Sequence, residues 1–62
     1  MIEVYRVFGK DCTEIVKIAT SLQEKRQKEL NGIAVEMCEL SFPKPVGDVQ
    51  YSILHLRRRA VV

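Results

Sequence analysis

Alternating apolar and polar positions at both ends of the chain enclose a middle segment with a helical period. Residues 1–8, 33–42 and 49–59 are rich in β-branched and aromatic side chains and largely alternate, which predicts three strands. Between the first two strands, apolar residues recur every three or four positions, which predicts a helix over residues 12–30. The residues of this apolar stripe are Ile15, Ile18, Ala19, Leu22 and Leu30.

Capping and turn residues mark the ends of these elements. Asp11 stands at the N-cap position and Glu14 follows three residues later, an arrangement that satisfies backbone donors of the first helical turn. Asn31 and Gly32 tolerate the left-handed conformation that ends many helices. Residues 43–48 contain prolines, a glycine and an aspartate, so we expect a hairpin loop there that forms no ladder.

The order of elements predicts an α+β domain of βαββ type that spans residues 1–62. A right-handed crossover through the helix makes the first two strands parallel, and the hairpin makes the third strand antiparallel to the second. The third strand then fits between the other two. The predicted structure is a three-stranded antiparallel sheet of order 1-3-2 with the helix on one face. Residues 60–62 either extend the third strand or fray.

The first two strands carry apolar side chains on both faces, whereas one helix covers only one face. The two sets are Ile2, Val4, Phe8 against Tyr5, Val7 in the first strand, and Cys38, Leu40, Phe42 against Ile33, Val35, Met37 in the second. Uncovered apolar patches of several hundred Å² usually mark an interaction surface, so we expect oligomerisation to complete the core. The expected interface residues are Ile33, Val35, Met37 and Val7. The alternative is that a few solvent-facing apolar residues are tolerated.

Length and cysteine content bear on how the core is stabilised. The chain has 62 residues, 47% of them hydrophobic, and domains of this size usually depend on a disulfide, a metal or a partner subunit. Cys12 and Cys38 are expected to be buried free thiols, with a disulfide between them as the alternative. His55 is the only histidine, so a zinc site would need several chains, and neither metal nor cofactor is expected. A homo-oligomer is the remaining means of stabilisation.

The same composition predicts a reduced, cytoplasmic protein, because two cysteines are too few for a secreted disulfide scaffold and no leader-like segment precedes the first strand. No apolar run approaches the ~20 residues that cross a bilayer, so no membrane partner is expected. The net charge of +2 is too small to indicate nucleic-acid binding by itself.

The last strand nevertheless carries a row of basic side chains. Because alternate residues share a face, His55, Arg57 and Arg59 project together, and Arg58 points the other way. Guanidinium groups bind phosphate or carboxylate with paired donors, so this row predicts a site for an anionic nucleotide or nucleic acid. The alternative is that the arginines are solubilising or pair with acids on neighbouring strands, which are Glu3, Glu36 and Glu39.

Aromatic and hydroxyl residues complete the set of candidates. Tyr5 and Tyr51 could stack on a nucleotide base, and the alternative places them at the edge of the core. Ser41 and Ser52 have no evident base and orienting acid, and no pair of carboxylates is marked out for acid and base roles. The sequence therefore predicts a binding protein and not an enzyme.

In layout the chain resembles the dodecins, which assemble βαββ protomers into hollow shells and bind flavin. Flavin stacking in that family relies on a tryptophan, and this chain has none, so the flavin role is not carried over. Segments 1–4 and 51–56 also resemble short sporulation-associated and phage-encoded proteins. That resemblance implies no established chemistry and no site residues. It implies a phage or mobile-element accessory protein, some of which block host defences by binding a host protein or sequestering a nucleotide signal.

Two functions of different classes follow from these features. The first is a homo-oligomeric, non-enzymatic protein that holds a nucleotide-like or nucleic-acid anion near His55, Arg57 and Arg59. The second is an interaction module that inhibits or scaffolds a host protein through its exposed sheet face or edge. A purely structural subunit of a closed assembly is a third possibility.

Overall fold

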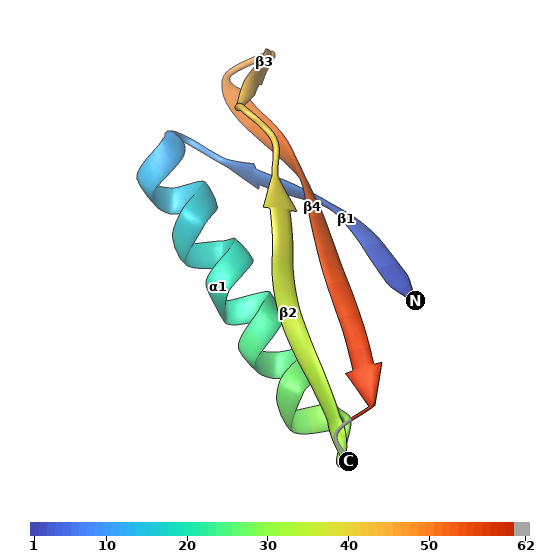
Figure 1. Cartoon of the computed structure of the whole chain (residues 1–62). Helices are drawn as coiled ribbons and strands as arrows, with labels where there is room; N and C mark the ends of the chain where they lie inside the picture. The colour runs from blue at the N-terminus through green and yellow to red at the C-terminus, as the bar shows by residue number, and fades with distance from the viewer. Residues whose placement is uncertain (61–62) are drawn as a thin grey trace.

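The computed structural model describes residues 1–60, which form one helix packed on one face of an antiparallel sheet (Figure 1). The elements in chain order are β1 (Ile2–Gly9), α1 (Cys12–Glu29), β2 (Ile33–Leu40), β3 (Lys44–Val46) and β4 (Val49–Ala60). The predicted α+β class is confirmed, with one strand more than a βαββ unit. Ala60 extends the last strand, and the prediction for residues 61 and 62 lies outside the described residues.

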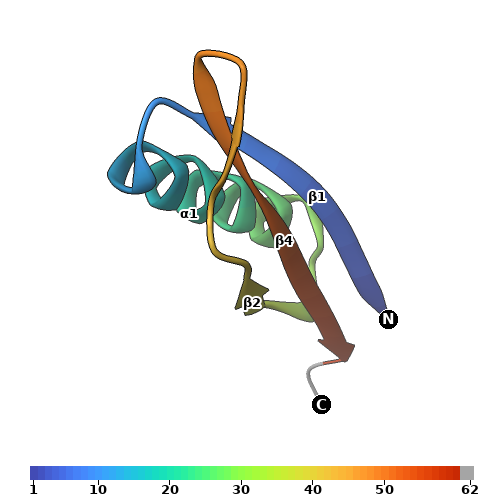
Figure 2. The same ribbon diagram turned by 90° about the horizontal axis from the view of Figure 1, so that it is seen from above.

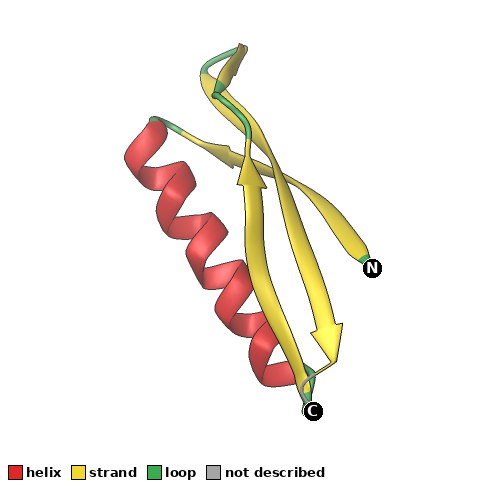
Figure 3. Cartoon of the chain, in the orientation of Figure 1, coloured by secondary structure: helices red, strands yellow, loops and turns green. Residues whose placement is uncertain are grey.

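The long strand β4 forms the centre of the sheet. The strand order is β1-β4-β2, both outer strands are antiparallel to β4, and β3 pairs with the beginning of β4. The predicted order, with the last long strand between the other two, is confirmed. Figure 2 shows α1 on one side of the sheet, and Figure 3 shows the β3–β4 hairpin extending beyond the N-terminal end of the helix.

The predicted capping residues fix the ends of α1. The Asp11 carboxylate accepts a hydrogen bond from the Glu14 amide at 2.9 Å, and the Glu14 carboxylate accepts one from the Lys10 amide at 3.0 Å. Gly32 has a φ of 75°, the left-handed conformation in which the chain leaves the helix. The helix therefore starts at the predicted residue and ends at Glu29, one residue before the predicted end.

The segment predicted as a loop without a ladder contains the short strand β3. Val46 pairs with Val49 and Pro45 with Gln50, and Gly47, with a φ of 59°, opens the two-residue turn between them. Residues that flank such a turn form a hydrogen-bonded pair, so the next pair is non-hydrogen-bonded and the Pro45 nitrogen faces away from β4. The prediction that this segment forms no ladder is wrong, because Pro45 lies on an edge strand at a position where its nitrogen would not donate to β4 in any case.

A bulge in β2 changes which of its side chains face the helix. The pairing with β4 skips Cys38. An extra residue reverses the alternation of a strand, so Leu40 lies on the same face as Val35 and packs against the core. The prediction that Cys38, Leu40 and Phe42 share one face is wrong for this reason. The strand also ends at Leu40, and Phe42, beyond it, is 91% exposed.

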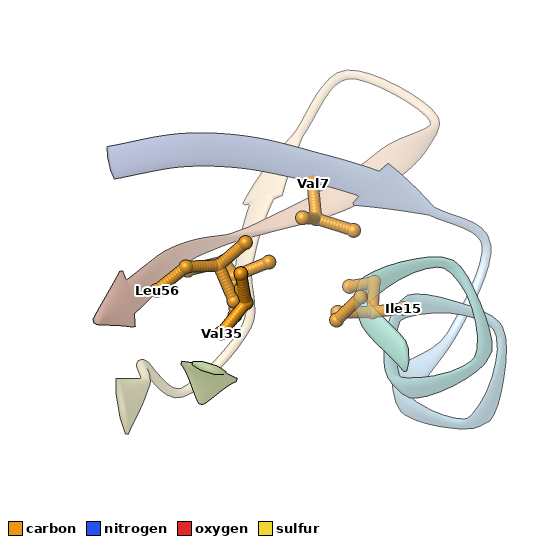
Figure 4. Packing of buried hydrophobic residues seen from close by; sticks show 6 residues of the cluster. Val7, Ile15, Val35 and Leu56 are labelled. Carbon is orange, nitrogen blue, oxygen red and sulfur yellow. The ribbon is translucent and has the colours of Figure 1, made fainter. Parts of the chain in front are cut away.

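The core lies between α1 and the sheet. Figure 4 shows Val7, Val35 and Leu56 of the sheet beside Ile15 of the helix. The buried apolar residues of the core are Val7, Ile15, Ala19, Val35, Leu54 and Leu56.

The expected interface is therefore wrong for two of its four residues, because Val7 and Val35 are only 2% and 3% exposed beneath the helix. The register places Ile33 and Met37 on the same face as Val35, with Ile33 half-buried and Met37 exposed. A strand that is apolar on both sides does not reveal which side the helix covers. The uncovered apolar set is instead the one that contains Ile2, Val4 and Phe8.

Two glutamines of α1 close part of the outer edge of β2. Gln27 donates to the Ile33 carbonyl at 2.8 Å and accepts from the Val35 amide at 2.8 Å. Gln23 donates to the Val35 carbonyl at 2.5 Å. These bonds satisfy backbone groups that an edge strand otherwise leaves open to another chain.

Both cysteines are free thiols, as predicted, but both are exposed. Cys12 opens the first turn of α1, and Cys38 lies at the bulge of β2, so neither position is covered by the core. The prediction that these thiols are buried is wrong.

Candidate functional site

The side of the sheet opposite α1, which we term the far face, is not covered by the helix. By register its side chains come from β1 (Ile2, Val4, Arg6, Phe8), β4 (Val49, Tyr51, Ile53, His55, Arg57, Arg59), β2 (Ala34, Glu36, Glu39) and β3 (Lys44, Val46). The apolar residues of β1 on this face are well exposed, with Ile2 at 47%, Val4 at 59% and Phe8 at 48%. The far face therefore combines exposed apolar side chains with exposed charge.

The predicted basic row lies on this face. The register places His55, Arg57 and Arg59 together there and Arg58 on the opposite side. Arg59 bonds the Glu36 carboxylate at 2.6 Å, as the alternative interpretation predicted. Arg57 is exposed and forms no ion pair within residues 1–60. The Nδ1 atom of His55 has no hydrogen-bond partner in this part of the chain but is buried, so Arg57 is the member of the row that offers unused donors at the surface.

A hollow at the β3 end of the far face adds three residues that the sequence analysis did not assign to a binding site, which are Arg6, Phe8 and Val46. This open hollow, of about 250 Å³, is lined by Arg6, Phe8, Val46 and Tyr51. The rings of Phe8 and Tyr51 have centroids 5.8 Å apart and are tilted by 35°. Arg6 is exposed and forms no ion pair within the described residues. The signal for Arg6 and Phe8 lies in the register, which sets Phe8 opposite Tyr51 and Arg6 opposite Ile53.

Tyr5 does not belong to this site. It pairs with Leu54 on the face covered by the helix, and its hydroxyl donates to the Glu3 carboxylate. That hydrogen bond, together with burial, raises the pKa of Tyr5. Of the two predicted stacking tyrosines, only Tyr51 lies on the far face, and Tyr5 lies at the edge of the core as the alternative predicted.

The charges beneath the helix form a separate structural cluster. The Glu3 carboxylate lies 2.8 Å from a guanidinium nitrogen of Arg26 and 3.1 Å from one of Arg58. The hydrogen bond from Arg26, with a further one from Tyr5, lowers the pKa of Glu3 to about 2. The same contact with Glu3 raises the pKa of Arg26. Arg58 is therefore held by Glu3 and does not contribute to the far face.

Opposite charges are separated across the far face. Among the cations that form no ion pair in residues 1–60, Arg6 lies on β1, Arg57 on β4 and Lys44 on β3, and the acids Glu36 and Glu39 lie on β2. Arg59 neutralises the first of these acids, and the second is exposed. An anion is therefore favoured over the β1–β4 half of the sheet and disfavoured over β2.

Neither of the two serines considered as nucleophiles, Ser41 and Ser52, lies on the far face as an exposed hydroxyl. The Ser41 hydroxyl accepts a hydrogen bond from the Ile53 amide at 2.8 Å, and Ser52 is fully buried on the helix side of β4. Within residues 1–60 no group of three or more His, Cys, Asp or Glu side chains is arranged to hold a metal ion. The same residues contain no helix long and apolar enough to cross a membrane. The far face itself offers cationic guanidinium groups beside aromatic rings.

Comparison of the chain with protein-family models, curated proteins and solved structures finds no match. The geometry and charge of the far face are therefore the features of this chain that bear on its function.

Proposed function

We propose that the chain is a small, non-enzymatic, homo-oligomeric binding protein that holds a nucleotide-like or nucleic-acid ligand on its far face. The observation that carries this proposal is the hollow in which Arg6 lies beside the paired rings of Phe8 and Tyr51. The resemblance to phage-encoded accessory proteins extends the proposal to sequestration of a nucleotide signal.

Each part of a nucleotide has a counterpart in the hollow. A base stacks on an aromatic ring such as that of Tyr51, an interaction that contributes about 1–3 kcal/mol per base. The Arg6 guanidinium offers paired donors to a phosphate. The exposed side chain of Val46 lies on the third side of the hollow and gives a sugar or base edge an apolar contact.

Removing either group from the hollow tests the proposal. We expect Tyr51→Ala and Arg6→Ala each to weaken binding of a fluorescein-labelled oligothymidylate about tenfold, because each removes one of the two recognition elements. The measurement is fluorescence polarisation in 50 mM salt. Lys17→Ala is the matched control, since it removes one positive charge from an exposed position on α1. Binding by both hollow variants at wild-type affinity would contradict the proposal.

The surface area supports the self-association in this proposal. The chain exposes 4566 Å², whereas a compact monomer of 7.1 kDa is expected to expose about 4,100 Å². Its Cα positions extend over 43 × 17 × 13 Å, so the excess arises from an elongated, two-layered shape. Burial of one sheet edge or face against a second copy would reduce that excess.

A second candidate function, binding of a host protein, is favoured by the exposed apolar residues of β1. Ile2 and Val4 lie at the end of the far face away from the hollow and offer an apolar contact without aromatic rings. Native mass spectrometry of the protein taken directly from cells separates the two candidates. A bound nucleotide or oligonucleotide supports the leading proposal, and a stoichiometric protein partner with no small ligand supports the second.

A further inference from the structure

The positions of Arg6 and Arg57, which form no ion pair within residues 1–60, lead us to infer that the ligand is a single strand of several nucleotides that runs along β4. This inference rests on the proposed function and names its ligand class. It distinguishes a strand from a lone mononucleotide, which shares the same base and phosphate chemistry.

The spacing of side chains along the sheet carries the inference. Arg6 is opposite Ile53, and Arg57 is four residues further along β4, which at about 3.3 Å per residue is a separation of about 13 Å. Tyr51 is six residues from Arg57, or about 20 Å. A base stacked at Tyr51 can place its own phosphate near Arg6, one row away. A phosphate at Arg57 requires a further nucleotide.

The surface between the two arginines suits the rest of such a strand. Ile53 and Val4 form an apolar floor between them, and His55 lies in the row between Arg6 and Arg57. His55 is half-buried and its Nδ1 atom is inaccessible to solvent, so the ring adds to this floor without offering that nitrogen to a ligand.

Negative charge on β2 borders the route that the ligand would follow along β4. Glu39 lies opposite His55 on β2 and is exposed, so it repels a phosphate on that side. On the other side β1 contributes Arg6 and apolar residues only. A polyanionic strand is therefore held over β1 and β4, parallel to the strands of the sheet.

Binding of oligothymidylates of one, two, four and eight nucleotides to wild-type protein and to Arg57→Ala tests the inference. Loss of one phosphate contact is expected to weaken binding about eightfold in 50 mM salt and to reduce the slope of log K against log salt by about 0.7. We expect this loss for the four- and eight-nucleotide strands, and unchanged binding of the mononucleotide. Arg57→Lys should restore most of the affinity and the slope, and Lys17→Ala is the control.

The possible outcomes separate failure of the single-strand inference from failure of the proposed nucleotide-binding function. Affinity that does not increase with length, together with no effect of Arg57→Ala on any strand, overturns this inference and leaves a mononucleotide site at the hollow. Failure of every probe to bind overturns the proposed function as well. Length dependence that Arg57→Ala abolishes, with Arg6→Ala weakening every probe, supports both.

Discussion

Glu3 links three elements through one carboxylate. Its side chain on β1 contacts Arg26 of α1 and Arg58 of β4, and it is only 15% exposed. Removing the negative charge would leave the partly buried Arg58 without its counterion and Arg26 with Glu29 alone. A buried or partly buried charge that loses its partner destabilises a protein far more than an exposed one does.

This contact predicts a pH-dependent loss of stability. At pH 7 we expect Glu3→Gln to lower the free energy of unfolding by about 1–3 kcal/mol. The pKa of Glu3 falls from 4.5 to about 2 on folding, so the carboxylate stabilises the fold fully above pH 4.5 and progressively less as the pH falls towards 2. Urea unfolding of wild type and variant at pH 7, 4 and 3 should therefore show a difference that shrinks with acid.

The exposed Glu24 provides the comparison, because Glu24→Gln removes the same charge from the outer surface of α1. That variant should differ from wild type by less than about 0.5 kcal/mol at pH 7. A difference for Glu3→Gln that stays constant from pH 7 to 3 would show that its carboxylate charge does not stabilise the fold.

The two tyrosines show what residue-level prediction achieved and where it stopped. Alternation along each strand placed His55, Arg57 and Arg59 on one face correctly, because that period is local. The same alternation places Tyr51 on this face, whereas the face on which Tyr5 lies depends on the register between β1 and β4, which is set by the packing of the whole sheet. The contributions of Arg6 and Phe8 to the hollow depend on the same register.

At the level of elements, the two edges of the sheet differ. The outer edge of β2 is interrupted by a bulge and partly closed by Gln23 and Gln27. The Arg58 amide donates to the Met1 carbonyl at 3.0 Å, and alternation along an antiparallel pair then directs the Val4 amide away from β4. Strand β1 therefore presents an edge of eight residues without proline or bulge, the type of edge that pairs with another chain.

We predict that self-association, if it uses this edge, is abolished by Val4→Pro. Proline removes an amide that points away from β4, so the β1–β4 ladder stays intact while pairing with a second copy loses a hydrogen bond. Sedimentation velocity at micromolar concentration should show wild type and Val4→Ala as dimers or larger and Val4→Pro as a monomer with native circular dichroism. A wild-type protein that sediments as a folded monomer would end the proposal of self-association.

The wrong predictions about the elements concern features that depend on contacts between strands. The helix bounds and strand order followed from capping residues, periodicity and connection rules that act over short distances. The bulge at Cys38 depends on how β2 meets β4, and the pairing of β3 depends on how it meets the start of β4. The bulge in turn moved Leu40 into the core, and the choice of covered face moved Val7 and Val35 there.

At the scale of the whole molecule, a two-layered domain with a small core leaves one broad sheet face to solvent. The helix covers the apolar residues on one side of the sheet. On the other side, the far face brings together aromatic rings, cations and apolar residues from β1 and β4. In our proposal, function and assembly use different parts of one sheet, with the ligand on the far face and a second copy at the β1 edge. A strand-paired dimer would make the two far faces continuous.

The most direct measurement of the central claim compares the ring signals of Tyr51 and Tyr5 by nuclear magnetic resonance as an eight-nucleotide oligothymidylate is added. The two tyrosines lie on opposite faces of the sheet, so each serves as the internal control for the other. We predict that the Tyr51 ring signals shift with ligand concentration while those of Tyr5 stay in place. Unchanged Tyr51 signals at saturating ligand, or equal shifts of both rings, would contradict a binding site on the far face.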